Sequence, residues 1–166
     1  MSMETPSRGF EPLRADEAVE EIVRRFRART LPREAWTHQA HLAVGLWHVL
    51  RHGEDAALAM LRDGIRAYNE AVGVPNSDTR GYHETVTRYY AWAAARFLER
   101  AGPGGLAGLV DAFVESRLGS KEGIFAFWSR AALLSVEARR GWIPPDLAPL
   151  DPAGLEAPVD AGRGAT

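Results

Sequence analysis

The sequence predicts an all-α fold: a single bundle of about six helices, followed by a C-terminal strap that contains prolines. Apolar residues recur every three or four positions along most of the chain, a spacing that puts them on one face of a helix. No segment alternates apolar and polar residues over more than a few positions, as a half-buried strand would. The connections are mostly short, and short connections favour neighbouring helices packed in one bundle.

Three amphipathic helices are predicted in the first half of the chain, at residues 15–29, 37–53 and 54–72. Pro32 separates the first two, because proline lacks the N–H group that a helix interior requires. Thr37 is the expected N-cap of the second helix, where its hydroxyl can accept a hydrogen bond from a free backbone N–H group. Gly53 and Gly73 end the second and third helices, since glycine readily adopts the left-handed conformation that follows a helix.

Three more helices are predicted in the second half. The stretch VPNSDTRG, residues 74–81, concentrates turn-forming residue types and forms a loop. A fourth helix follows it to about Arg100, and a fifth begins at Leu106 after a turn rich in glycine and proline. Ser120 is the expected N-cap of a sixth helix through the strongly apolar IFAFWSRAALL, residues 124–134, which predicts a central position for this helix.

The C-terminal part is expected to consist of a strap and a tail. Residues 141–150, GWIPPDLAPL, cannot be helical through the paired prolines, but their apolar side chains predict an extended strap packed on the bundle. Residues 151–166 are small and turn-rich, which predicts a disordered tail. Residues 1–150 are expected to form one helical domain, since a chain of 166 residues fits a single domain of ordinary size.

Composition excludes several classes of function. The formal net charge is -2 and no basic run is interleaved with aromatic residues, so nucleic acid is not expected as a partner. The absence of cysteine excludes thiol catalysis and leaves His, Asp and Glu as the side chains for any metal. No run approaches the roughly 20 apolar residues of a membrane span, and no signal peptide is recognisable, so we expect no membrane partner and a cytoplasmic location.

The only pattern that points to chemistry is a set of three histidines. WTHQAHL at residues 36–42 puts His38 and His41 in the first turn of the second helix, within reach of a common ion. GYHETVT at residues 81–87 supplies His83, whose ring is expected to point inward at the start of the fourth helix. Three imidazoles at one end of the bundle, with open positions for water or substrate, predict a catalytic zinc or non-haem iron site.

Other polar residues are predicted to surround this site. Glu84 lies about 100° round the helix from His83 and faces away from the apolar stripe, so its carboxylate is expected to interact with the helix dipole and not with a metal. Asp78 and Glu70 are freer candidates for a carboxylate ligand. Five residues could give hydrogen bonds to a small polar ligand in the same pocket: Tyr68, Asn69, Tyr82, Thr85 and Thr87.

Three segments occur in a fixed order along the chain: WTHQAHL, then GYHETVT about 45 residues later, then PPDLAPL near the end. This combination resembles an uncharacterised family of small bacterial all-helical proteins with THxAHL-like and GYHETxT-like segments. The resemblance spans residues 36–150 and implies that His38, His41 and His83 belong together. It implies no particular reaction.

Two functions are compatible with these residues. In the first, His38, His41 and His83 are catalytic in an enzyme that acts on a small polar metabolite, either through a bound metal or with one histidine as general base. In the second, a non-catalytic helical module binds a ligand, a partner or a second copy of itself, and its histidines are structural. A shared site requires the ring nitrogens to meet within about 4 Å, whereas structural histidines each donate to their own backbone carbonyl.

Overall fold

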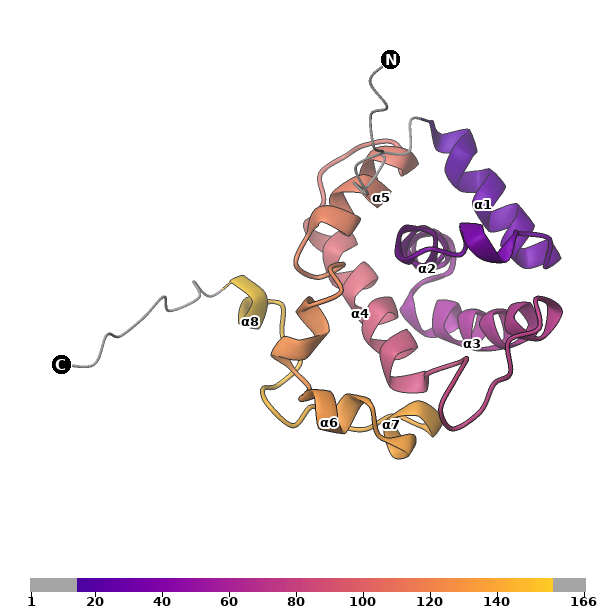
Figure 1. Ribbon diagram of the computed structural model, residues 1–166. Coiled ribbons are helices and arrows are strands. Elements are labelled where there is room, and N and C mark those ends of the chain that lie inside the picture. Colours follow the sequence, from indigo (N-terminus) through magenta and orange to yellow (C-terminus); the bar gives the residue numbers. More distant parts are fainter. Residues whose placement is uncertain (1–14, 157–166) are drawn as a thin grey trace, which may run out of the picture.

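The computed structural model describes residues 15–156, which form an arrangement of helices without any strand (Figure 1). The predicted all-α fold is therefore confirmed for this part of the chain. Five helices are long: α1 (Asp16–Ala28), α2 (His38–His52), α3 (Glu54–Ala71), α4 (Glu84–Arg100) and α5 (Leu106–Glu115). Five pieces are short: the 3₁₀ turns η1 (Arg33–Ala35) and η2 (Gly123–Ala126) and the helices α6 (Arg130–Leu133), α7 (Val136–Arg140) and α8 (Ala153–Glu156).

Helix α2 is at the centre of the bundle and contacts α1, α3, α4 and α5. Figure 1 shows it almost along its axis, with α1, α3 and α4 around it. Its position follows from its composition, because a helix with apolar residues on most of its circumference has to be buried. The buried side chains of α2 include Leu42, Val44, Leu46 and Val49. The prediction that a sixth helix occupies the centre is wrong.

The first five helices begin and end close to the predicted residues. Thr37 caps α2 as predicted, since its Oγ1 accepts a hydrogen bond from Ala40 N–H at 3.2 Å. Gly53 separates α2 from α3 with a φ of 80°, a left-handed conformation that glycine adopts without strain. The histidines of WTHQAHL therefore lie in the first turn of α2, next to η1.

The predicted sixth helix is divided into three short elements, so its prediction as one helix is wrong. Ser120 is not a helix N-cap: its Oγ accepts a hydrogen bond from Gly123 N–H at 3.0 Å, but Glu122 is the N-cap residue of η2. Ser129 and Ser135 start α6 and α7, and each accepts a hydrogen bond at 3.1 Å from the N–H group three residues further along. Serine side chains compete in this way for backbone N–H groups that would otherwise continue a helix.

The strap predicted at residues 141–150 is not helical, and it packs against the helices. Trp128 Nε1–H donates a hydrogen bond to the Ile143 carbonyl at 3.2 Å. Leu147 N–H donates to the Phe127 carbonyl at 2.9 Å. These bonds tie the strap to the segment between η2 and α6.

The chain is helical again where the sequence predicts a tail. Residues 153–156 form α8 and Leu155 is buried, so the prediction of disorder from residue 151 onward is wrong for this turn. Arg117 Nη1–H donates to the Leu155 carbonyl at 2.7 Å, which joins α8 to the segment after α5. The rest of the predicted tail, residues 157–166, lies outside the described residues. Within the part that the structure describes, no helix is long and apolar enough to cross a membrane.

Candidate functional site

Two adjoining cavities lie between η1 and helices α2, α3 and α4. The first has a volume of about 280 Å³ and the second of about 320 Å³. Five residues form walls of both cavities: Trp36, His41, Ile65, Val86 and Thr87. His38 lines only the first cavity and His83 only the second. The three histidines singled out in the sequence therefore lie around one pair of cavities.

The first cavity has mostly apolar walls. Its aliphatic wall residues come from three helices: Leu42, Leu61, Ile65, Val86 and Ala91. Its two hydroxyl groups are already bonded within the protein, since Tyr90 donates to the Ser120 carbonyl at 3.0 Å and Thr87 donates to the His83 carbonyl at 2.8 Å. The cavity therefore presents chiefly apolar surface to a bound molecule.

His41 is held in one orientation at the boundary between the two cavities. Its Nδ1 lies 2.6 Å from the Thr37 carbonyl oxygen, and because a carbonyl can only accept, Nδ1 carries the proton. The ring stacks on Trp36 with centroids 3.7 Å apart and an interplanar angle of 29°. Nε2 therefore carries the lone pair, and no residue within 15–156 donates a hydrogen bond to it.

The protonation state of His41 follows from its surroundings. Burial lowers its pKa to about 4, although the hydrogen bond to the Thr37 carbonyl opposes this effect. By accessible surface His41 is nevertheless exposed, because the open side of its ring faces the two cavities. Protein atoms surround the ring on its other sides, and this crowding lowers the pKa. His41 is therefore neutral at pH 7, and its Nε2 can accept a hydrogen bond there.

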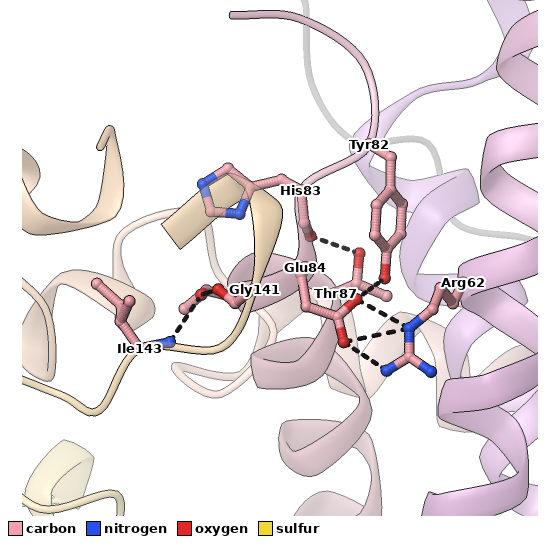
Figure 2. A network of polar contacts seen from close by, with 8 residues as sticks. Arg62, Tyr82, His83, Glu84, Thr87, Gly141 and Ile143 are labelled. Atoms are coloured by element: carbon pink, nitrogen blue, oxygen red, sulfur yellow. Dashed lines mark hydrogen bonds and ion pairs between the residues drawn. The ribbon is translucent and has the colours of Figure 1, made fainter. Parts of the chain in front are cut away.

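His83 uses both of its ring nitrogens within the protein. It is the N-cap residue of α4, where Nδ1 accepts a hydrogen bond from Val86 N–H at 3.2 Å. Nε2–H donates to the Leu133 carbonyl of α6 at 2.8 Å. Figure 2 shows the ring directed away from the side chain of Arg62. His83 could bind an ion only by giving up one of these two hydrogen bonds.

His38 is also bonded to a backbone carbonyl. Its Nε2–H donates to the Gly119 carbonyl at 2.8 Å. His38, His41 and His83 thus each donate to a different carbonyl, and the described residues contain no group of three His, Asp or Glu side chains that could hold a metal ion. The three histidines do not fit the predicted zinc or iron centre, because their carbonyl partners direct the rings and no common ion position results.

Four of the five residues predicted to contact a ligand line the second cavity: Tyr68, Asn69, Tyr82 and Thr87. Thr85 lies outside both cavities and is fully buried. Its hydroxyl donates to the Gly141 carbonyl at 2.9 Å and accepts from Ile143 N–H at 3.3 Å. Thr85 therefore holds the strap against α4.

Polar groups around the second cavity are largely engaged with the protein. Tyr68 donates its hydroxyl hydrogen to the Leu31 carbonyl at 3.0 Å, and Asn69 Nδ2–H donates to Asn76 Oδ1 at 3.0 Å. Asp78, a carboxylate candidate from the sequence, instead accepts hydrogen bonds from Arg140 at 2.7 and 2.6 Å. These bonds fix the loop and the walls of the cavity.

Glu84 lies in the first turn of α4, at the helix start where the sequence places it, but its carboxylate is also buried and ion-paired. It is 8% exposed and accepts hydrogen bonds from the Arg62 guanidinium, including one from Nε at 3.0 Å, and from the Tyr82 hydroxyl (Figure 2). Burial alone would raise the pKa of Glu84, but the hydrogen bonds from Arg62 and Tyr82 lower it overall. No sequence pattern indicates this pair, since Arg62 and Glu84 lie on different helices.

Arg33, Trp36 and Tyr90 are among the wall residues that the sequence-based site lacks. Trp36 directly precedes the N-cap of α2, a position where an apolar residue often packs back on the first turn. That rule could have indicated the stacking of Trp36 on His41. Arg33 and Tyr90 have no comparable sequence signal.

No protein-family model matches this sequence, and comparison with curated proteins and with solved structures found no match either.

Proposed function

We propose that the protein binds a small, largely apolar molecule in the two adjoining cavities, and that His41 accepts a hydrogen bond from an N–H or O–H group of that molecule. The observation that carries this proposal is the position of His41. Its ring is fixed by Thr37 and Trp36, while its Nε2 lone pair has no partner among residues 15–156 and the ring lines both cavities. A preformed acceptor in a mostly apolar cavity is typical of small-molecule sites.

The size of the cavities supports a small molecule. Their volumes of about 280 and 320 Å³ are near the lower end of the range of roughly 300 to 1,000 Å³ that is common for ligand pockets. The aliphatic walls of the first cavity favour a more apolar ligand than the small polar metabolite expected from the sequence.

The enzyme hypothesis receives less support from the same residues. An effective general base has a pKa near the working pH, whereas burial lowers the pKa of His41 to about 4. Burial also lowers the pKa values of His38 and His83, and the Nε2–H group of each is already donated to a carbonyl. These histidines are therefore better suited to hydrogen bonding than to proton transfer at neutral pH. A metal at His38, His41 and His83 stays a prediction from the sequence.

The test uses two bicyclic probes of the same shape, indole and benzofuran, which differ in that only indole has an N–H donor. Calorimetric titration of the parent protein should show indole binding about fivefold more tightly than benzofuran, the effect of one hydrogen bond of about 1 kcal/mol. In His41→Phe, which keeps an aromatic ring against Trp36, this preference should disappear.

His52→Phe is the matched control, because His52 is an exposed histidine of the same helix that lines neither cavity. It should keep the preference for indole. Equal affinities for the two probes in the parent, or a preference that survives in His41→Phe, would contradict the proposal.

A further inference from the structure

The charge around the two cavities is unevenly distributed. Among the described residues, no charged side chain lines the first cavity. Arg33 is the one charged residue of residues 15–156 in the wall of the second cavity. His41 and His83, which also line the second cavity, are neutral because burial lowers both pKa values. Glu34, the nearest acidic residue in sequence, is exposed and lines neither cavity. Arg33 is therefore the one charged group, among the described residues, that a molecule in the second cavity meets in the cavity wall.

Arg33 also differs from most arginines of the described chain in having no partner. Arg62 and Arg140 form ion pairs, Arg88 lies over the Trp142 ring, and Arg139 donates to backbone carbonyls. No hydrogen bond, ion pair or ring contact joins the Arg33 side chain to another residue within 15–156. Its five N–H donors are available to an external group, and their planar arrangement matches a carboxylate.

We infer that the ligand is an amphipathic anion, with its apolar part in the first cavity and a carboxylate bound by Arg33 at the second. This inference rests on the proposed function, because it assigns a class of ligand to the same two cavities. His41 lies between the two ends and accepts a hydrogen bond from the middle of the molecule. Apolar walls, a neutral acceptor and a free guanidinium then recognise three different parts of one ligand.

The test uses indole derivatives that carry a carboxylate on an alkyl chain of increasing length. Indole-3-acetate, indole-3-propionate and indole-3-butyrate are each titrated calorimetrically against the parent protein, beside the corresponding neutral amides. At least one carboxylate should bind about fivefold more tightly than its amide, which is the upper range for an exposed ion pair. The preference should weaken when the salt concentration rises from about 0.05 to 0.5 M, because ions screen exposed charges.

Arg33→Gln should abolish the preference for the carboxylate. Arg29→Gln is the matched control, because Arg29 is also exposed, forms no side-chain hydrogen bond or ion pair among the described residues, and lines neither cavity. It removes the same charge and should leave the preference intact.

The outcomes separate this inference from the proposed function. If every carboxylate binds within twofold of its amide while indole still binds more tightly than benzofuran, the anion inference is overturned and the cavity proposal stands. Loss of the preference in Arg29→Gln as well would also overturn it, because the effect would then come from overall charge. If neither indole nor any derivative binds, both proposals fail.

Discussion

Two sets of polar side chains, one centred on Glu84 outside the cavity walls and one in the wall of the second cavity, differ in how completely the protein satisfies their hydrogen bonds. On α3 and α4, Glu84 is buried and accepts hydrogen bonds from Arg62 and Tyr82. On η1 and α2, the Arg33 guanidinium and the His41 Nε2 atom have no hydrogen-bond partner in the described part of the chain. The first set makes its hydrogen bonds within the protein. The second set, the open set, has no hydrogen-bond partner among the described residues and lies beside a cavity.

This difference suggests how to separate stability from binding in a protein of this kind. Polar groups that satisfy each other contribute to the folded state, and their loss leaves a partner buried without compensation. Polar groups that have no partner in the protein and line a cavity contribute little to folding and are available for a ligand. Substitutions in the two sets should therefore have separate effects, on unfolding in one case and on binding in the other.

The largest effect is expected for Glu84→Ala. Removing the carboxylate leaves the Arg62 guanidinium and the Tyr82 hydroxyl without their acceptor, which should lower the free energy of unfolding by about 2 to 3 kcal/mol. The value lies below that of a fully buried pair, because the Arg62 side chain is 34% exposed. Urea denaturation at pH 7 measures it, and the preference for indole over benzofuran should persist.

Glu21→Ala is the control for this substitution. Glu21 accepts hydrogen bonds from Arg24 and Arg25 on the surface of α1, where water screens the charges, so its loss should cost much less stability.

The contribution of Glu84 to stability should also depend on pH. Because the folded pKa of Glu84 lies below its ordinary value of 4.5, this contribution is present above pH 4.5 and is lost as the pH falls through the folded pKa. A difference between Glu84→Ala and the parent that did not shrink at low pH would contradict this assignment.

A smaller effect is expected for Thr85→Val, which removes one buried hydroxyl with little change in shape. The Gly141 carbonyl and the Ile143 N–H group then lose their partner, which should lower the free energy of unfolding by about 1 to 2 kcal/mol. Hydrogen exchange at Ile143 N–H should become faster, since the strap is held less firmly. Thr79→Val, at an exposed loop position, should change neither quantity. Unchanged exchange at Ile143 would show that the strap does not depend on Thr85.

Some helix starts depend on residues close together in the sequence, whereas others depend on how the whole chain packs. The helix starting at Thr37 was predictable, because a capping hydroxyl and the apolar spacing of α2 both act within a few residues. The sixth helix was mispredicted, because Ser129 and Ser135 each cap a new short helix, while Ser120 is of the same residue type and caps none.

The sequence indicated that several of these side chains lie near one another, but it could not indicate how their rings are oriented. Helical spacing indicated that His38, His41 and His83 lie near one end of the bundle, and all three line the cavities. It could not indicate that His38 donates to Gly119 or His83 to Leu133, since these partners lie 81 and 50 residues away in sequence. Ring orientation depends on such contacts, and a metal site depends on ring orientation.

The smallest effect is expected for the pH dependence of indole binding, which tests the open set alone. Only neutral His41 can accept a hydrogen bond at Nε2, and with its pKa lowered to about 4 by burial the ring stays neutral down to about pH 5. The dissociation constant of indole should therefore change less than about twofold between pH 8 and 5.5. A histidine with an ordinary pKa near 6.5 would instead weaken indole binding about fourfold at pH 5.5, toward the affinity of benzofuran.

Benzofuran provides the control for this measurement, because it has no N–H group and its affinity reports only whether the cavities remain folded. Protonation of His41 favours the unfolded chain, in which the histidine pKa is near 6.5, so stability should decline as the pH falls from about 6.5 toward 4. Indole binding that weakened with a midpoint near pH 6.5, while benzofuran binding stayed constant, would mean that His41 titrates as an ordinary histidine. In that case His41 could act as a general base near neutral pH. The enzyme hypothesis would then gain support, because the objection from a lowered pKa of His41 would no longer hold.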